Sequence, residues 1–248
     1  MKVEKRIEKI KNWILNYCKS MPKNPDCLVI GVSGGIDSAV TSTLCALTGM
    51  KTIVLSMPIK QIKIQDNLSN THCDWLNQKF KNVQAKKINL DSVFDQFQNA
   101  LEDYKSDHAY ANSRARIRMT TLYQVAGSSK GIVVGTGNKV EDFGVGFYTK
   151  YGDGGVDISP IADCTKTQIW EMGKELKILE DIINAEPTDG LWLDGRTDEN
   201  QLGMTYKELE EAMQNSKDKN HKKYLEIRKK NLHKMLPIPV CKMDDKLQ

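Results

Sequence analysis

The chain has 248 residues, 40 per cent of them hydrophobic and 27 per cent charged, which is typical of a single globular domain and excludes a disordered or fibrous protein. Its formal charge of +4 is mild, and the basic residues come without a duplex-binding motif or interleaved aromatic residues, so we expect no nucleic-acid partner. The six cysteines show no CxxC spacing, and no apolar stretch near the N-terminus is long enough for a signal or a membrane span, so we expect a cytoplasmic protein without a membrane partner.

Short apolar runs that alternate with helical patterns fill the first half of the chain. The predicted strands cover residues 27–32, 52–57, a weaker run at 83–90, and 131–136. The predicted helices cover residues of about 3–20, 37–47, 64–80, 92–104 and 108–126. This alternation predicts an α/β fold, a Rossmann-like doubly wound parallel sheet with flanking helices. Ligands in such sheets bind at the carboxyl ends of strands, where the loops at 31–35 and 135–137 meet.

The second half of the chain carries long polar loops. Residues 137–164 hold six glycines and little periodicity, which indicates a functional loop. A capped helix is predicted over 165–179, and the polar segment 187–203 is typical of a mobile lid. Two C-terminal helices are expected within 205–234, at about 205–214 and 218–234. We expect residues 1–248 to form one domain.

The stretch CLVIGVSGGIDSAV, residues 27–40, runs from a predicted strand through glycines into a helix start, which is a usual place to bind phosphate. It matches neither GxxxxGK[ST] nor GxGxxG, the two common nucleotide fingerprints. The glycines allow backbone N–H groups to approach an oxyanion, and Ser33 and Ser38 add hydroxyl donors. Asp37 by itself would repel phosphate, which argues for a bridging Mg²⁺. The alternative is a tight turn in which Asp37 is the N-cap of the helix.

The run SGGIDS resembles the signature of the ATP pyrophosphatase family, whose members cleave ATP between the α and β phosphates. The resemblance implies that this loop holds the leaving pyrophosphate while AMP is transferred. No P-loop lysine is then required, because the γ-phosphate does not move. The loop residues implied to contact ATP are Gly31, Val32, Ser33, Gly34, Gly35, Ile36, Asp37 and Ser38.

Six further segments follow the order found in the ammonia-dependent NAD synthetases, which the chain resembles from about residue 3 to 240. They are NSRARIRM (112–119), GTGNKVE (135–141), FYTKYGDGGVDISPI (147–161), TKTQIWEMGKEL (165–176), PTDGLW (187–192) and TDENQLGMTY (197–206). The resemblance implies a ligase that adenylates the nicotinate carboxylate of deamido-NAD with ATP and then amidates it with ammonia. The products would be NAD, AMP and pyrophosphate, and much of the catalysis would be electrostatic and entropic.

The resemblance also implies a Mg²⁺ site with two carboxylate ligands, which suits a reaction that must neutralise a polyphosphate. Asp37 is one ligand by its place in the loop, and Glu141, at the end of GTGNKVE, is the second. The chain has one residue more than many members between Glu141 and YTKYGDG, so Asp142 is a fallback ligand. The alternative for Glu141 is a solvated loop acid.

Three residues outside the loop are assigned to ATP by the resemblance: Thr136, Lys166 and Thr188. Lys166 stands at a predicted helix start, where a lysine is unfavourable beside the positive end of the helix unless it faces a phosphate. The ordinary alternative for Thr188 is a turn in which its hydroxyl bonds the backbone beside Pro187. Asp37, Lys166 and Thr188 are the expected catalytic residues.

The residues that the resemblance assigns to the dinucleotide substrate are Arg116, Lys150, Asp157, His233 and Lys234. Arg116 is the first arginine of an ARxRM pattern, and Arg118 has a structural alternative. The pair His233–Lys234 is less firmly placed, because Met235 stands where the family has an arginine and a second pair occurs at His221–Lys222.

The length leaves no room for a glutamine-hydrolysing domain of a few hundred residues, so we expect free ammonia, or a separate glutaminase subunit, to supply the nitrogen. The resemblance implies a homodimer whose subunits share the dinucleotide site. One rival is a related pyrophosphatase, such as a GMP synthetase core or a tRNA-modifying enzyme, but no catalytic cysteine motif or strong basic clustering supports the latter. Another rival is a non-catalytic nucleotide sensor, which would have little need for two carboxylates beside phosphate.

Overall fold

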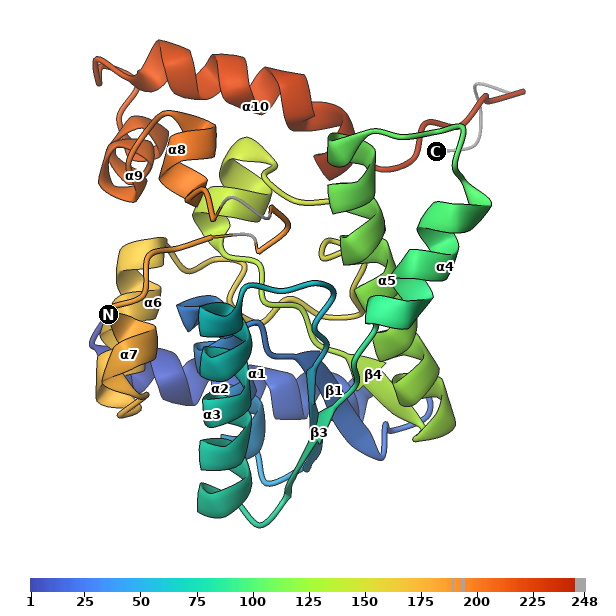
Figure 1. Ribbon diagram of the computed structural model, residues 1–248. Helices are drawn as coiled ribbons and strands as arrows, with labels where there is room; N and C mark the ends of the chain where they lie inside the picture. The colour runs from blue at the N-terminus through green and yellow to red at the C-terminus, as the bar shows by residue number, and fades with distance from the viewer. Residues whose placement is uncertain (189, 193–194, 244–248) are drawn as a thin grey trace.

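The computed structural model describes residues 1–188, 190–192 and 195–243 (Figure 1). Within these residues the sheet has four parallel strands in the order β3-β2-β1-β4. The strands are β1 (Cys27–Gly31), β2 (Lys51–Ser56), β3 (Val83–Lys87) and β4 (Gly131–Val133). Because β2 and β3 lie on one side of β1 and β4 lies on the other, the sheet is doubly wound, as predicted, with its switch point between β1 and β4.

Helices cover both faces of this sheet. They are α1 (Val3–Ser20), α2 (Ile36–Leu47), α3 (Lys63–Lys79), α4 (Asp91–Ala100), α5 (Asp107–Ser128), the π-helix η1 (Lys139–Val145), α6 (Lys166–Glu175), α7 (Glu180–Ile183), α8 (Asp198–Leu202), α9 (Tyr206–Gln214) and α10 (His221–Met235). None of the helices in the described ranges combines the length and apolar character that a membrane crossing requires.

Strand β1 shows why the predicted strands are continuous apolar runs. Leu28 and Ile30 point into a core that includes side chains of α1, α2, α3 and α6. Cys27 and Val29, which alternate with them, point into a second core with side chains of α4 and α5. A strand buried on both faces has no place for a polar alternate, so periodicity of two is absent from its sequence.

A third, smaller core joins η1 to the C-terminal helices. It contains Val140 and Val145 of η1 and buried side chains of α8, α9 and α10. In Figure 1 these C-terminal helices, coloured orange to red, gather at one end of the molecule. The two helices predicted within 205–234 are therefore α9 and α10, and they pack on the glycine-rich loop that follows β4.

The loop predicted over 137–164 contains regular structure that its sequence did not indicate. The Asn138 side chain accepts from the backbone N–H groups of Val140 (2.9 Å) and Glu141 (3.1 Å) and so starts η1, which ends at Gly146 with φ of 68°. A π-helix of seven residues is too short and too rare to leave a recognisable period. Two short helices, α7 and α8, were also not predicted, and α8 lies within the predicted lid 187–203. Other differences are ends of elements: β3 stops at Lys87 and α4 at Ala100.

A buried histidine between α2 and α3 gives a prediction about acid stability. The His72 ring is fully buried, its Nε2 lies 3.1 Å from Ser42 Oγ, and its Nδ1 has no partner in the described structure. Burial lowers the pKa of His72 to about 4. Between this value and the unfolded-state pKa of about 6.5, the unfolded chain binds more protons, so stability must fall as the pH falls. We expect the free energy of unfolding to drop on the order of 3 kcal/mol across that window through this group.

The measurement is urea unfolding at several pH values between 7 and 4.5, for the parent protein and for His72→Gln. Glutamine keeps a polar side chain near Ser42 but does not titrate. The parent is expected to lose stability more steeply on acidification than the variant. Equal slopes for the two proteins would show that His72 is not a source of the acid sensitivity.

Candidate active site

A pocket of about 250 Å³ opens at the carboxyl edge of the sheet. Its walls include Ser33 and Asp37 after β1, Met57 after β2 and Gly135 after β4, together with residues of α5 and α6, residues 185–188 and Leu191. This is the edge at which a doubly wound sheet binds its ligand. The predicted phosphate loop and the predicted lid therefore line one cavity.

The SGGIDS loop is tightly folded against the N-terminus of α2. The Ser38 hydroxyl donates to Gly35 O (2.9 Å) and accepts from Ser33 N–H (3.2 Å), which closes the loop on itself. Gly34 has φ of 92°, and a Cβ there would lie 2.8 Å from Gln65 O, so a side chain is excluded. The loop thus brings backbone and hydroxyl groups to the positive end of a twelve-residue helix.

Asp37 is not the cap of that helix. The N-cap position belongs to Gly35, and no side chain caps it. The Asp37 carboxylate instead accepts from Lys166 Nζ at Oδ2 (2.6 Å) and from Asn138 Nδ2 at Oδ1 (2.9 Å). The N-cap alternative is therefore wrong, and Asp37 faces outward into the site.

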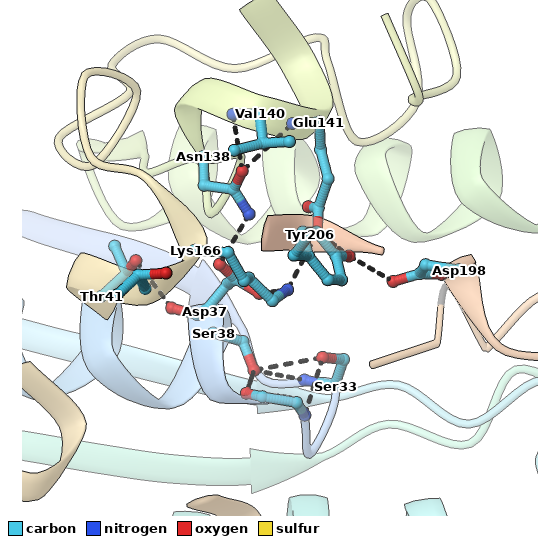
Figure 2. A network of polar contacts seen from close by, with 12 residues as sticks. Ser33, Asp37, Ser38, Thr41, Asn138, Val140, Glu141, Lys166, Asp198 and Tyr206 are labelled. Carbon is cyan, nitrogen blue, oxygen red and sulfur yellow. Dashed lines mark hydrogen bonds and ion pairs between the residues drawn. The ribbon is translucent and has the colours of Figure 1, made fainter. Parts of the chain in front are cut away.

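Lys166 joins the two carboxylates predicted as metal ligands (Figure 2). Its side chain is only 2 per cent exposed, and Nζ also donates to Glu141 Oε1 (2.9 Å). Thr165 caps α6 with a full capping box, which fixes the lysine at the first position of the helix. Three segments that are distant in sequence, beginning α2, η1 and α6, thus meet at one ion triad of Asp37, Glu141 and Lys166.

The pKa values of the triad reflect burial and mutual attraction. Burial opposes the charge of Lys166, but Asp37 and Glu141 outweigh it and raise the lysine pKa, so Lys166 is a cation. Burial also opposes ionisation of Glu141, yet Lys166 and the donors around it lower the pKa of that carboxyl. Burial, reinforced by the negative charge of Glu141, raises the pKa of Asp37. Two carboxylates and one lysine leave an excess of negative charge at the site.

Two residues of the triad's surroundings have roles that the sequence analysis did not assign. The Tyr206 hydroxyl lies within hydrogen-bond distance of the Glu141 carboxylate and of Asp198 Oδ2 (2.9 Å) and donates its single proton to one of them at a time; its ring lies 4.6 Å from Lys166 Nζ (Figure 2). Tyr206 begins α9 and Asp198 begins α8, so both belong to the TDENQLGMTY segment. The segment as a whole resembles the family, but nothing local in the sequence singles out these two residues within it.

The acidic lining of the pocket fits a divalent cation. Among the described residues that line it, seven are acidic and two, Arg118 and Lys166, are basic. Burial, then the charges of Asp153, Glu141 and Asp37, raise the pKa of the neighbouring Asp142. Within the described residues no group of three or more His, Cys, Asp or Glu forms a protein-only metal cage. Mg²⁺ bound through one or two carboxylates and substrate phosphates needs no such cage.

Thr136 and Thr188 both line the pocket, as the ATP assignment requires. The Thr188 hydroxyl accepts from Gly190 N–H (3.2 Å) and donates to Arg196 O (3.1 Å), so the local turn weighed as its alternative is present as well. Residues 189, 193 and 194 of the predicted lid 187–203 lie outside the described residues, and the mobility of the lid stays a prediction.

The residues predicted to bind the dinucleotide lie outside the pocket wall. Arg116 is exposed on α5 and its Nε donates to Lys150 O (3.2 Å), while Lys150 Nζ donates to His233 O (3.4 Å). Asp157 is exposed in the loop after η1, where it accepts from the Tyr123 hydroxyl of α5 (3.0 Å) and from Val133 N–H (2.7 Å). Three of the five predicted residues thus form one surface cluster, and Asp157 lies apart from it.

At the end of α10, Lys234 Nζ donates to Tyr148 O (2.8 Å), beside the same surface cluster. His221, of the competing pair, lies at the start of the helix with its Nδ1 2.7 Å from Ala212 O. Of the two pairs, the one at 233–234 is the one near Lys150. The assignment of either pair to substrate stays a prediction.

The arginine that lines the pocket is Arg118. It donates to Met57 O (3.0 Å) and to Gln61 Oε1 (2.7 Å), two groups in the loop after β2. Because helical residues two apart point in different directions, Arg116 and Arg118 cannot face the same ligand atoms. Sequence spacing alone did not decide which arginine enters the cavity.

Comparison with known proteins identifies the family. The NAD synthase family model matches residues 6–247. An NH₃-dependent NAD⁺ synthetase of Carboxydothermus hydrogenoformans is 37 per cent identical over 212 residues, 84 per cent of each chain. One of Finegoldia magna is 34 per cent identical over 236 residues, 94 per cent of each.

Among solved structures, NMN synthetase of Francisella tularensis has a TM-score of 0.89 at 30 per cent identity, covering 97 per cent of this chain and 99 per cent of that one. NH₃-dependent NAD synthetase of Campylobacter jejuni has a TM-score of 0.78 at 26 per cent identity, covering 98 and 100 per cent. The chain belongs to the NAD synthase family.

Proposed function

We propose that this protein is an ammonia-dependent NAD synthetase, which converts deamido-NAD, ATP and ammonia into NAD, AMP and pyrophosphate. The observation that carries the proposal is the buried triad of Asp37, Glu141 and Lys166, which lines the same pocket as the SGGIDS loop. The names of relatives that match most of the chain support the same activity.

The chemistry requires activation of a poor electrophile. A nicotinate carboxylate oxygen attacks the α-phosphorus of ATP, and the bond from that phosphorus to the bridging oxygen breaks, which releases pyrophosphate. Ammonia then attacks the carbonyl carbon of the resulting mixed anhydride, loses a proton and displaces AMP. Pyrophosphate and AMP are both stable anions, so the enzyme's main contributions are charge neutralisation and positioning.

Each part of the pocket has a role in that scheme. The N-terminus of α2, with the hydroxyls of Ser33 and Ser38, binds the departing pyrophosphate. Lys166 holds its cationic group at the same place and orients the carboxylates of Asp37 and Glu141. Thr136 and Thr188 contact ATP from the strand end and the lid. The acidic lining argues that these carboxylates hold Mg²⁺, which would neutralise polyphosphate charge.

We also propose that the protein is a homodimer. Its cytoplasmic location stays a prediction. Arg116, Lys150 and His233 cluster on the surface outside the cavity that holds the triad. A second subunit placed over this cluster would enclose a dinucleotide that a single subunit leaves partly exposed. Sedimentation velocity of the purified protein tests this point.

The likeness to NMN synthetase favours a second candidate substrate. The Francisella tularensis structure matches this fold over nearly the whole of both chains, with a TM-score of 0.89. Amidation of nicotinic acid mononucleotide would use the same carboxylate chemistry and the same triad. Nicotinic acid mononucleotide differs from deamido-NAD only in that it lacks the adenylate half.

One assay tests both candidates. The protein is mixed with ATP, Mg²⁺ and ammonium, and with either deamido-NAD or nicotinic acid mononucleotide, and the products are separated by chromatography. NAD with AMP and pyrophosphate, at a higher kcat/KM than for the mononucleotide, is the expected result. A higher kcat/KM for the mononucleotide would move the assignment to the second candidate. ADP and phosphate as products would overturn cleavage between the α and β phosphates.

A further inference from the structure

The π-helix η1 carries Glu141, and its N-terminal end is fixed to the active site. Asn138 accepts from the N–H groups of Val140 and Glu141, and its amide nitrogen donates to Asp37 (Figure 2). The Asn138 side chain, which is fully buried, therefore starts η1 and also bonds η1 to the Asp37 carboxylate. What holds the other end of η1 is a separate question.

Helix α10 supplies donors to that other end. The last carbonyl groups of a helix have no partner within it. Arg228 Nη1 donates to Phe143 O and to Gly144 O (2.6 Å), and Asn231 Nδ2 donates to Val145 O (3.0 Å). Three consecutive carbonyls are thus bonded by two side chains of one neighbouring helix.

Lys234 continues the same row. Residues 228, 231 and 234 are three apart and share one face of α10. Lys234 Nζ donates to Tyr148 O (2.8 Å) and lies 5.1 Å from the centre of that ring. Burial lowers the pKa of Lys234, and the charges of Asp153 and Asp142 oppose this change. The row therefore follows the loop from the end of η1 towards the acidic wall of the pocket.

The two backbones approach closely where this row begins. Gly146, which ends η1 with φ of 68°, lies so near α10 that a Cβ would come within 2.7 Å of Asn231 Cβ. Apolar packing of Val140 and Val145 with Tyr224 of α10 runs beside the polar row. Helix α10 and η1 are therefore closely packed, so a displacement of α10 would also displace η1.

We propose that Arg228 and Asn231 are positioning residues that set the place of Glu141 in the active site through η1. The inference rests on the proposed function, because it assigns Glu141 a role in the reaction. The hydrogen bonds from Arg228 and Asn231 to η1 all end on backbone carbonyls, so these two residues act on chemistry through the carboxylate that η1 carries. A displacement of about 1 Å in such a group is enough to cost up to a hundredfold in rate.

The test is Arg228→Met, which keeps the length of the side chain but removes its donors. We expect kcat to fall roughly tenfold or more, with KM for ATP changed less than about threefold, because Glu141 acts mainly on the transition state. Arg228→Lys retains one donor and is expected to recover most of the lost kcat. Asn231→Leu is expected to act in the same direction as Arg228→Met.

Lys229→Met is the matched control, since Lys229 is exposed on the same helix. Thermal unfolding of every variant accompanies the kinetics, and hydrogen exchange of the amides at 141–147 is expected to speed up in Arg228→Met but not in Lys229→Met. An unchanged kcat in Arg228→Met, with an active parent, overturns the inference. So does a loss of kcat that Arg228→Lys does not recover. A parent protein that forms no amidated product overturns the proposed function instead.

Discussion

Asp37→Asn is expected to lower turnover by roughly a hundred- to a thousandfold, the usual effect of removing one preorganised charge from an active site. Asparagine has nearly the shape of aspartate but carries no charge and offers one acceptor oxygen. It leaves Glu141 as the single anion beside Lys166, so the site loses the charge excess that suits Mg²⁺. The measurement is kcat for NAD formation at saturating substrates, over a range of Mg²⁺ concentrations.

Stability should change little in Asp37→Asn. The substitution leaves one of two donors, Lys166 or Asn138, without its oxygen, which costs about 1–3 kcal/mol. It also removes a buried charge whose pKa burial and Glu141 already raise, which offsets part of that cost. Asp163→Asn, at an almost fully exposed acid, is the matched control and is expected to behave as the parent. If Asp37→Asn unfolds far more easily yet keeps its turnover per folded molecule, the role of Asp37 is structural.

The fold followed closely from the sequence, because its signals are local. The run CLVIG is apolar throughout, as a strand buried on both faces must be, and its alternate residues enter two different cores. Thr165 and Gln168 predict the start of α6 by the same capping box that the structure contains. Such features need only neighbours within a few residues.

The active site was only partly predictable, because its geometry comes from contacts across the chain. Lys166 is separated from Asp37 by 129 positions, and nothing in the sequence says that one ammonium joins both carboxylates. Its odd place beside a positive helix end predicted a phosphate partner; the partners in the structure are acids, and the assignment of Lys166 to ATP stays a prediction. Tyr206 and Asn138 carried no such signal, since each is an ordinary residue at a helix start until η1 is folded beside it.

Arg116 and Arg118 show the same limit at the substrate side. Both stand on one helix, two residues apart, and the motif favoured the first for the dinucleotide. The structure places the second in the wall of the pocket and the first on the surface beside Lys150. The spacing of the two arginines in the sequence does not encode this difference, because it depends on which side of α5 packs against the loop after β2.

Lys166→Met is expected to be the most destabilising single change in the site. It leaves Asp37 and Glu141 as two buried carboxylates without their common cation, and breaking a buried ion pair in this way costs about 3–5 kcal/mol. That is a large part of the total stability of a domain, which is about 5–15 kcal/mol. Turnover should also fall sharply, since the positive charge at the phosphate site is lost. Urea unfolding of the variant beside Lys174→Met, an exposed lysine of the same helix, gives the difference.

The double variant Asp37→Asn with Lys166→Met separates charge from packing. If the cost of Lys166→Met comes from uncompensated negative charge, removing one carboxylate must return part of it, so the double variant is expected to be more stable than Lys166→Met alone. Turnover would not return, because both groups serve the reaction. Strictly additive losses would instead mean that Lys166 stabilises the fold through contacts other than the triad, such as that of its Nζ with the Tyr206 ring. Stability and turnover would then respond to different contacts of the same side chain.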